Sequence, residues 1–458
     1  MNLSNHLVIP VTAFALLLTL SAPESFANSP QFRGPSGNGV YGEEMKVPIE
    51  WGADTNVKWK IDAKGRGWSS PVIWGDKVFI TTAVEEKKEG ESEEEVEQPN
   101  RRDRGNEGRG RGGGGGRDRD RSLNKVFTWE VHCLDRATGK TLWKEVAHQG
   151  KPSIPTHRSN TYASETPVTD GERLYVYFGM VGVFCYDLDG KLAWKKDLGS
   201  YEMTNGWGTA SSLALHEEHL FVQVDSENDS FVTALKTADG SEAWRVKRPD
   251  EGSNWGSPVI WKNKERTELI LGGNKVRSYE PATGKVNWEL DMNGGRSSAS
   301  PSGDLERLIV GTEERRARGG RQASGGRLCS VKVGASGDIT PQEGETTSDG
   351  LHWLREKGGP AMASPLIYED YLYVLERSNI LNCYHVKTGE PVYSKTRVKG
   401  ARAFWASPWA HDGHVYCLDD SGSTNGLRID DEACAKVVLK DQSVVTLGRV
   451  DMVFRKLQ

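Results

Sequence analysis

A single four-part unit recurs about every 40–65 residues along the chain, a period that indicates a repeat architecture. Each unit begins with small residues, usually Ser-Pro, that lead into a short apolar strand, and it ends in a Gly turn followed by an aromatic strand. Seven starts are evident: Trp68–Pro71, Ser164–Pro167, Thr209–Ser212, Trp255–Pro258, Ser298–Pro301, Met362–Pro365 and Trp405–Pro408. The closing turns and strands are Thr138–Trp143, Asp189–Trp194, Asp239–Trp244, Thr283–Trp288 and Thr388–Tyr393.

Short strands in a fixed order, separated by turn residues, predict an all-β fold built from blades of four strands each. One such sheet cannot bury both of its faces, whereas blades stacked in a closed ring bury them and remove the exposed edges. We therefore expect a β-propeller of seven or eight blades over residues 51–420. Residues 56–60 have the pattern of a fourth strand but no blade before them, so we expect this N-terminal strand to close the last blade.

The Ser-Pro, Cys-Leu-Asp and Thr-Gly-Lys-x-x-Trp elements of these units resemble the PQQ-type propeller repeat. That repeat occurs in quinoprotein dehydrogenases and in BamB, a lipoprotein of outer-membrane assembly. The stretch Gln31–Gly39, followed by residues 56–60, resembles exported PQQ-like propellers of planctomycetes. The resemblance covers about residues 30–420, and it implies the propeller fold more specifically than any activity.

The N-terminus predicts export. Residues 7–20 are mostly apolar and Ser25-Phe-Ala27 has small residues at the −3 and −1 positions, which is typical of a signal peptide over residues 1–27. Residues 28–50 would then be an N-terminal extension of a periplasmic or extracellular protein. The apolar run is too short for a comfortable membrane span, and an uncleaved anchor is the alternative. We expect no membrane span after cleavage, and a monomer.

Two insertions interrupt the repeat. Residues 85–124 run from a Glu-rich into an Arg/Gly-rich block, whose composition predicts disorder, and residues 313–327 form a basic, Gly-rich loop. Both fall between the second and third strands of a blade, on the face that also carries the links between blades. Each could be an adaptable lid or a polyanion-binding arm, and the alternative is a tolerated loop insertion. Because the net charge is only −5, we expect no nucleic-acid partner.

The cysteines follow the repeat rather than a disulfide pattern. Of the six, Cys133, Cys185, Cys383 and Cys417 occupy the same third-strand position, and Cys329 approximately does so. A small buried residue is suited to that position, and equivalent positions in neighbouring blades should be too far apart to bridge. The sequence therefore predicts free thiols with a packing role.

The segments before the strand starts should surround the mouth of the central channel. They supply aromatic, cationic and amide side chains suited to a flat or anionic ligand, or to a protein partner. Repeated Trp residues can instead be packing elements between blades, so the non-repeating cations are the better ligand candidates. The candidate binding residues are Arg66, Trp68, His157, Arg158, Asn205, Trp207, Asn254, Trp255, Arg296, Arg402 and Trp405.

The sequence favours a binding or scaffold module over an enzyme. A PQQ- and Ca²⁺-dependent oxidoreductase, the rival implied by the resemblance, needs a planar cofactor held over a Trp, a metal on oxygen ligands and an acidic base. The chain has no adjacent Cys pair, no CxxCH haem motif and no evident set of metal ligands, and most Asp residues fall in turns. We therefore predict no metal site and no cofactor, with PQQ and Ca²⁺ as the alternative. Unrecognised hydrolase or lyase chemistry also stays open.

The repeat stops after Gly422. Residues 421–458 contain a Ser-Thr-Asn-Gly turn and a Leu-Gly-Arg strand entry, which resemble the second half of a forkhead-associated domain. Such domains bind phosphothreonine peptides, and Asn425 would be the matching contact residue. A diverged closing blade is the alternative, because Thr-Asn-Gly is also a common hairpin turn.

Overall fold

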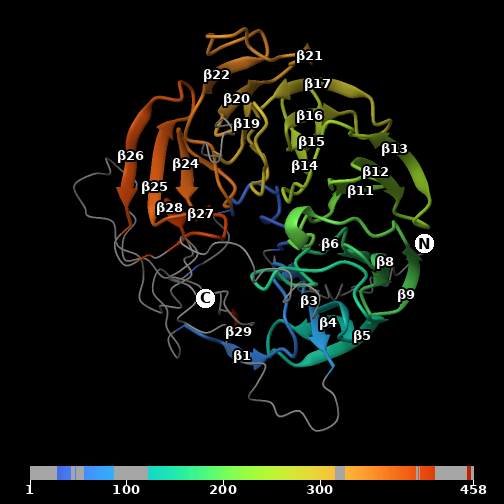
Figure 1. Ribbon diagram of the computed structural model, residues 1–458. Helices are drawn as coiled ribbons and strands as arrows, with labels where there is room; N and C mark the ends of the chain where they lie inside the picture. The colour runs from blue at the N-terminus through green and yellow to red at the C-terminus, as the bar shows by residue number, and fades with distance from the viewer. Residues whose placement is uncertain are drawn as a thin grey trace, which may run out of the picture.

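The computed structural model describes residues 28–42, 47, 56–86, 122–314, 325–398, 401, 403–417 and 451–454. The chain forms an all-β propeller, as the repeat predicts (Figure 1). The described strands make five four-stranded sheets, one five-stranded sheet and two strand pairs. One 3-10 turn, η3 (Thr204–Gly206), lies between the second and third blades.

Blades 1 to 3 each consist of four consecutive antiparallel strands. Blade 1 consists of β2 (Val72–Trp74), β3 (Lys77–Glu85), β4 (Phe127–Asp135) and β5 (Thr141–Gly150). Blade 2 consists of β6 (Val168–Thr169), β7 (Arg173–Phe178), β8 (Gly182–Asp187) and β9 (Leu192–Lys196). Blade 3 consists of β10 (Ala214–His216), β11 (His219–Val224), β12 (Phe231–Lys236) and β13 (Glu242–Lys247).

Blades 4 to 7 continue the ring. Blade 4 consists of β14 (Val259–Lys262), β15 (Thr267–Leu271), β16 (Lys275–Tyr279), β17 (Val286–Asp291) and the added strand β21 (Gly337–Asp338). Blade 5 consists of β18 (Ser302–Gly303), β19 (Arg307–Gly311), β20 (Leu328–Lys332) and β22 (Leu351–Arg355). Blade 6 consists of β23 (Leu366–Tyr368), β24 (Tyr371–Glu376), β25 (Ile380–His385) and β26 (Pro391–Arg397), and blade 7 of β27 (Trp409–His411) and β28 (His414–Tyr416).

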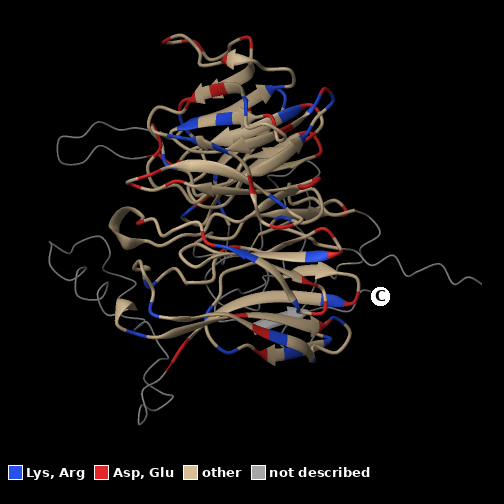
Figure 2. Cartoon of the chain, turned by 90° about the vertical axis from the view of Figure 1, so that its right-hand side faces the viewer, with Lys and Arg blue, Asp and Glu red and all other residues tan. Residues whose placement is uncertain are grey.

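Every predicted strand start leads into the first strand of a blade. These first strands lie around the centre of the ring and contact one another in chain order, from β2 to β27 (Figure 1). Apolar clusters lie between consecutive blades, so each sheet buries one face against the next. Seen from the side, basic and acidic residues are interspersed over the stacked sheets (Figure 2). This agrees with the near-balanced charge of the sequence.

Hydroxyl side chains link the blades around the centre. The residue before the strand-start Pro, or its equivalent, accepts a hydrogen bond from the backbone N–H of the same position one blade earlier, at 2.9–3.0 Å. The participating residues are Ser70, Thr166, Ser212, Ser257, Ser300, Ser364 and Ser407. A short hydroxyl therefore satisfies a backbone donor that no strand partner reaches, which explains the Ser of the repeated Ser-Pro.

Fourth-strand Trp residues provide a second set of links. The indole of Trp143 in blade 1 lies on Gly190 in the turn of blade 2, and its Nε1 donates to the Leu188 carbonyl at 2.9 Å. Trp194, Trp244 and Trp353 repeat this arrangement on Gly240, Gly284 and Gly389. The turn Gly is required because it has a positive φ and because a Cβ atom would collide with the ring.

The strand before blade 1 was predicted to complete the last blade; among the described strands it pairs with β29 and not with β27 or β28 of blade 7. β1 (Trp59–Asp62) pairs antiparallel with β29 (Asp451–Phe454) near the other end of the chain. Trp59 lies on Gly139 of blade 1 and donates its Nε1 hydrogen to the Arg136 carbonyl at 2.9 Å. β1 therefore packs against blade 1 in the same way as the fourth strand of a blade packs against the blade that follows it.

Blade 4 departs from the repeat. The connection between β20 and β22 reaches across to blade 4, where β21 pairs in parallel with β17. Ile339, which follows β21, is buried in the cluster between blades 4 and 5. Trp288 has no neighbouring Thr-Gly-Lys turn to cover, and its Nε1 instead donates to the buried Glu268 of its own blade at 2.9 Å.

The five cysteines in the described part of the chain are free, as predicted. Burial raises the pKa of the Cys133, Cys185 and Cys329 thiols to about 12, which keeps them protonated. They act as small apolar side chains in the sheets.

Candidate functional site

The links between blades and the two insertion points lie on one face of the ring, which we call the mouth face. Arg66, in the link before β2, forms an antiparallel bridge with Ala83 near the end of β3, where the first insertion begins. Likewise, the backbone N–H of Glu313 donates to the Arg296 carbonyl at 3.0 Å. The opposite face, which carries the β2–β3 turn and its equivalents, is called the turn face below.

Two predicted site residues present exposed indoles on the mouth face. Trp68 is 46% exposed and Trp405 is 39% exposed, although both are large apolar side chains. They stand at the same repeat position, three residues before the strand-start Pro, in blades 1 and 7. The guanidinium of Arg377 lies 4.5 Å from the centre of the Trp405 ring.

Trp255 occupies the same repeat position in blade 4 but is a packing residue. Its indole is half-buried, and its Nε1 donates to the Gly208 carbonyl of the preceding link at 2.8 Å. The packing interpretation therefore holds for Trp255, whereas Trp68 and Trp405 differ from it in exposure.

His157, in the link before blade 2, and Trp207, in the link before blade 3, form a stacked pair. Their rings lie 4.2 Å apart at an interplanar angle of 23°. Asn160 fixes the two links by donating to the carbonyls of Trp207 at 2.9 Å and Thr209 at 3.0 Å. Arg66 reaches the same region, where its Nη2 donates to the Arg158 carbonyl at 3.0 Å.

Arg296 belongs to a set of polar side chains that includes Thr204 of η3. Its Nη2 donates to Oγ1 of Thr204 at 3.2 Å and lies 3.8 Å from the Glu227 carboxylate. Ser253 donates to that carboxylate at 2.7 Å. The Ser253 hydrogen bonds and the nearby Arg296 charge hold the pKa of Glu227 below its usual range. Asn205, which has a left-handed φ of 55°, is exposed beside this group.

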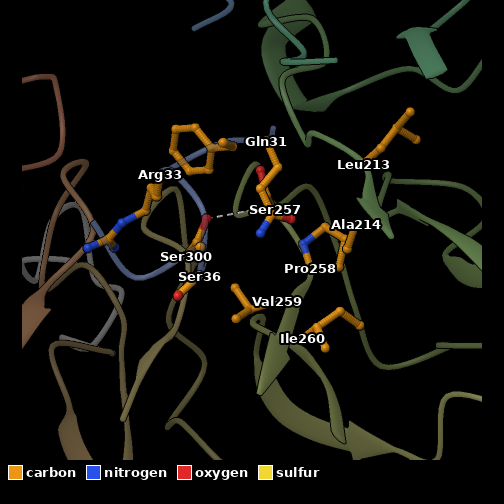
Figure 3. Close-up of a pocket in the computed structure, with 12 residues that line it drawn as sticks. Gln31, Arg33, Ser36, Leu213, Ala214, Ser257, Pro258, Val259, Ile260 and Ser300 are labelled. Atoms are coloured by element: carbon orange, nitrogen blue, oxygen red, sulfur yellow. Dashed lines mark hydrogen bonds between the residues drawn. The ribbon is translucent and has the colours of Figure 1, made fainter. Parts of the chain in front are cut away.

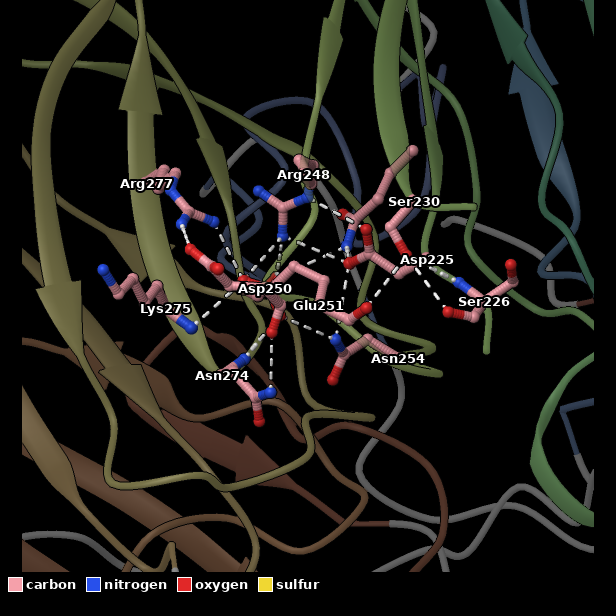
Figure 4. A network of polar contacts seen from close by, with 12 residues as sticks. Asp225, Ser226, Ser230, Arg248, Asp250, Glu251, Asn254, Asn274, Lys275 and Arg277 are labelled. Carbon is pink, nitrogen blue, oxygen red and sulfur yellow. Dashed lines mark hydrogen bonds and ion pairs between the residues drawn. The ribbon is translucent and has the colours of Figure 1, made fainter. Parts of the chain in front are cut away.

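Asn254 was expected at the mouth but is buried in a polar network between blades 3 and 4 (Figure 4). Its Nδ2 lies 3.4 Å from Asp225 and 3.3 Å from Glu251, and its Oδ1 accepts from the Ser297 backbone N–H at 3.0 Å. This geometry gives Asn254 a structural role within the network rather than a place on the mouth surface.

The centre of that network is the fully buried Arg248. It donates to both carboxylate oxygens of Asp225, at 2.9 and 3.1 Å, and to Oη of Tyr279 in blade 4 at 3.0 Å. Burial disfavours the charged guanidinium and is the largest single influence on it, but Asp225, Tyr279 and Glu251 together outweigh burial and raise the pKa of Arg248. The network ties blade 3 to blade 4.

A buried carboxyl that the sequence analysis did not single out lies in the link before β6. Glu165 is 1% exposed, and its Oε2 accepts from the Ser164 backbone N–H at 3.2 Å. Burial raises its pKa to about 7, although hydrogen bonds from Thr209 and nearby backbone act in the opposite direction. The corresponding positions in other blades hold Ser, Gly or Ala, so the break in the pattern was a usable signal.

The centre of the ring is occupied by the N-terminal segment, residues 28–41, which the sequence analysis treated only as an extension. Ser29 pairs with Ile73 of β2, and Val40 pairs with Ala410 of β27. Between them, Gln31, Phe32 and Arg33 line a small pocket with the inner residues of blades 3 to 5 (Figure 3). Part of the chain therefore lies against the first strands of the blades at the centre of the ring.

Two predicted site residues, Arg402 and Asn425, lie outside the described residues. So does most of the tail, including the forkhead-associated resemblance, and so do residues 87–121 and 315–324 of the two insertions.

A Ca²⁺–PQQ site would need a group of oxygen ligands for the metal ion. Ca²⁺ takes six to eight oxygen ligands, yet within the described ranges no three His, Cys, Asp or Glu side chains are grouped closely enough to hold a metal ion. Glu227 lies beside the candidate residue Arg296. Its carboxylate already accepts a hydrogen bond from Ser253 and lies 3.8 Å from the Arg296 guanidinium.

Comparisons with known proteins agree with the repeat. Residues 129–312 match the family described as outer membrane protein assembly factor BamB. A search of curated proteins finds no match. Similar solved structures include BamB from Moraxella catarrhalis, at 11% identity and a TM-score of 0.44, covering 64% of this chain and 76% of that one.

Two dehydrogenase structures are also similar. One is a europium-containing methanol dehydrogenase, at 8% identity and a TM-score of 0.39, covering 84% of this chain and 87% of that one. The other is the quinohemoprotein alcohol dehydrogenase from Comamonas testosteroni, at 10% identity and a TM-score of 0.39, covering 85% and 76%. With its repeated blades and the family match over residues 129–312, the chain is similar to PQQ-like repeat proteins.

Proposed function

We propose that this chain is an exported binding or scaffold module that contacts a protein partner through its mouth face. The observation that carries the proposal is the exposure of Trp68 and Trp405 at one repeat position, where Trp255 is packed. Exposed indoles are candidates for contact with a partner, because Trp has a large apolar ring with one polar N–H and is enriched at protein interfaces.

The surroundings of the two indoles suit a protein partner. Trp and Arg are enriched among the residues that carry most binding energy at protein interfaces. Arg377 lies over Trp405, and Arg66 lies two residues before Trp68. A partner that covers these side chains would bury apolar area and place the guanidinium groups at a polar rim.

The family match gives the proposal a cellular setting. BamB is described as an outer membrane protein assembly factor, and we propose a comparable assembly role here. Cleavage after Ala27 would leave Asn28 and Ser29 as the first residues, and both already bond to blade 1. Within the described ranges, no helix has the length and apolar character needed to cross a membrane.

Site-specific photo-crosslinking in the native host tests the proposal. A photoreactive amino acid replaces Trp68 or Trp405, and Leu305 serves as the matched control because it is 61% exposed on the turn face. We expect both mouth positions to capture the same protein and Leu305 to capture none. Equal capture at Leu305, or no capture at either mouth position, would refute a partner site at the mouth.

A further inference from the structure

The N-terminal segment (residues 28–41) binds the ring as a peptide ligand would. Its contacts are mostly main-chain hydrogen bonds to first strands of the blades. Ser29 exchanges two such bonds with Ile73, both at 2.9 Å, and the Pro30 carbonyl accepts from the Thr169 N–H at 2.9 Å. Asn28 adds a side-chain contact, its Oδ1 accepting from the Gly75 N–H at 2.9 Å.

The other end of the segment is bound to blade 7. The Gly39 carbonyl accepts from the Ala410 N–H at 2.8 Å, and the Tyr41 N–H donates to the Ala410 carbonyl at 3.0 Å. The Tyr41 ring stands edge-on to Trp409, with centroids 5.6 Å apart. The segment thus joins blade 1 to blade 7, the first and last blades that the described part of the chain forms.

Arg33 is the central side-chain anchor. It is 7% exposed, and its Nη2 donates to the Pro365 carbonyl of blade 6 at 2.8 Å and to the Asn38 carbonyl at 2.7 Å. Nε and Nη1 are buried and find no hydrogen-bond acceptor among the described residues. Burial without a neighbouring carboxylate lowers the pKa of Arg33 to about 10. Because part of a buried cation is left unsatisfied, the segment is held less tightly than its contacts alone would allow.

From these contacts we propose that the central channel is a binding site for an extended, Arg-containing peptide, and that residues 28–41 are its resident, replaceable ligand. Main-chain pairing with strand edges supplies affinity in such sites, and a few side chains supply specificity. Here the edges are those of β2 and β27, and the specificity group is the guanidinium that reaches Pro365. The proposal is independent of a partner at the mouth face.

The test loosens the resident segment in the full-length chain without touching the blades. A Cβ atom at Gly34 would lie 2.7 Å from the Tyr41 ring, and Gly34 has a φ of +78°. Gly34→Ala should therefore displace Tyr41 from Trp409. Gly37→Ala is the matched control, because Gly37 has a similar φ of +66° but its Cβ would meet its nearest atom only at 3.5 Å.

Binding is measured by fluorescence anisotropy of a labelled synthetic peptide with the sequence of residues 28–42. The Gly34→Ala chain should bind it saturably and at least about tenfold more tightly than the wild-type chain, in which the tethered segment competes at high effective concentration. The Gly37→Ala chain should bind the peptide with an affinity closer to that of the wild-type chain. A peptide with Ala in place of Arg33 should bind the Gly34→Ala chain at least about tenfold more weakly, the loss expected for a buried charged hydrogen bond.

Hydrogen exchange separates release of the segment from unfolding. The amides of Ile73, Thr169 and Ala410 donate to the segment, so they should exchange faster in Gly34→Ala and recover when the peptide is added. Faster exchange at these amides without saturable peptide binding would overturn the proposal, as would equal binding by wild type and variant. Unchanged exchange in both Gly34→Ala and Gly34→Ala/Gly39→Ala would also overturn it, because the segment would then be a fixed part of the fold.

Discussion

The indole of Trp59 covers Gly139 so closely that a Cβ atom at position 139 would lie 2.5 Å from Cε3 of the ring. This contact joins a strand near the N-terminus to the Thr-Gly-Lys turn of blade 1. It repeats the contact that Trp143, Trp194 and Trp244 make with the blades that follow them. The closure of the ring therefore uses the same packing unit as the ring itself.

Gly139→Ala should destabilise the protein more than Gly75→Ala. Both glycines lie in turns of blade 1 with positive φ, 74° and 56°, so both substitutions incur backbone strain of about 1 kcal/mol. Only Gly139 faces a ring, and overpacking adds about 1–3 kcal/mol, whereas a Cβ at Gly75 meets nothing within 4 Å. Urea unfolding of the two variants measures the difference, and equal losses would show that Trp59 does not pack on this turn in solution.

Ser300→Ala should cost about 1–3 kcal/mol of unfolding free energy, because it leaves the buried N–H of Ser257 without its acceptor. Ser300→Thr is the control. Thr166 occupies the same repeat position and accepts the Ser70 N–H at 2.9 Å, so Thr should keep most of the stability. Thermal unfolding compares the two, and a loss with Thr as large as that with Ala would contradict a role for the hydroxyl.

Because of Glu165, the free energy of unfolding should decrease as the pH rises from 4.5 to 7. Its folded-state pKa of about 7 lies above the ordinary glutamate value of 4.5, so the folded chain binds the proton more tightly than the unfolded chain. The favourable contribution is complete below pH 4.5 and is lost through pH 7, at a cost of about 3 kcal/mol.

Glu165→Gln removes this dependence and should stabilise the protein at pH 8 relative to wild type, with a smaller difference at pH 5. Glu227→Gln should show the opposite trend, since the pKa of Glu227 is lowered and its charged form is favoured by folding. Denaturant unfolding at both pH values tests the pair. A parallel pH dependence of wild type and Glu165→Gln would mean that Glu165 titrates normally.

The five described thiols should resist modification in the folded protein. Burial raises the pKa of four of them, Cys133, Cys185, Cys329 and Cys417, to about 12, so the reactive thiolate is scarce at pH 8. The sixth cysteine, Cys434, lies outside the described residues and is replaced by Ser for the measurement. In this Cys434→Ser variant, a thiol-specific dye should react slowly in buffer and with all five thiols in denaturant. Rapid reaction in buffer, or fewer thiols in denaturant, would contradict buried free cysteines.

The parts of the fold that follow the repeat could be predicted from the sequence. Ser300 and Trp143 stand in local patterns that recur in other blades, so each position has the same neighbours in every copy. The pairing of β21 with β17 could not be predicted, because it joins segments about 50 residues apart through main-chain bonds that carry no sequence signature.

The placement of the candidate residues was predictable in part. The strand order puts the inter-blade links on one face, so Trp68 and Trp405 could be assigned to that face from the sequence, and both are exposed there. The burial of Asn254 depends on its partners Asp225 and Glu251, which converge only in the folded chain. The placement of residues 28–41 in the channel is likewise a long-range contact that no local pattern reveals.

The rival to a binding module is a quinoprotein enzyme, and one titration separates them most directly. Purified mature protein is titrated with PQQ and Ca²⁺ while Trp fluorescence and dye-linked alcohol or sugar oxidation are recorded. Because Glu227 is already engaged and the channel contains residues 28–41, we predict neither saturable quenching nor turnover. Saturable quenching accompanied by turnover would contradict the account and identify the chain as a quinoprotein oxidoreductase.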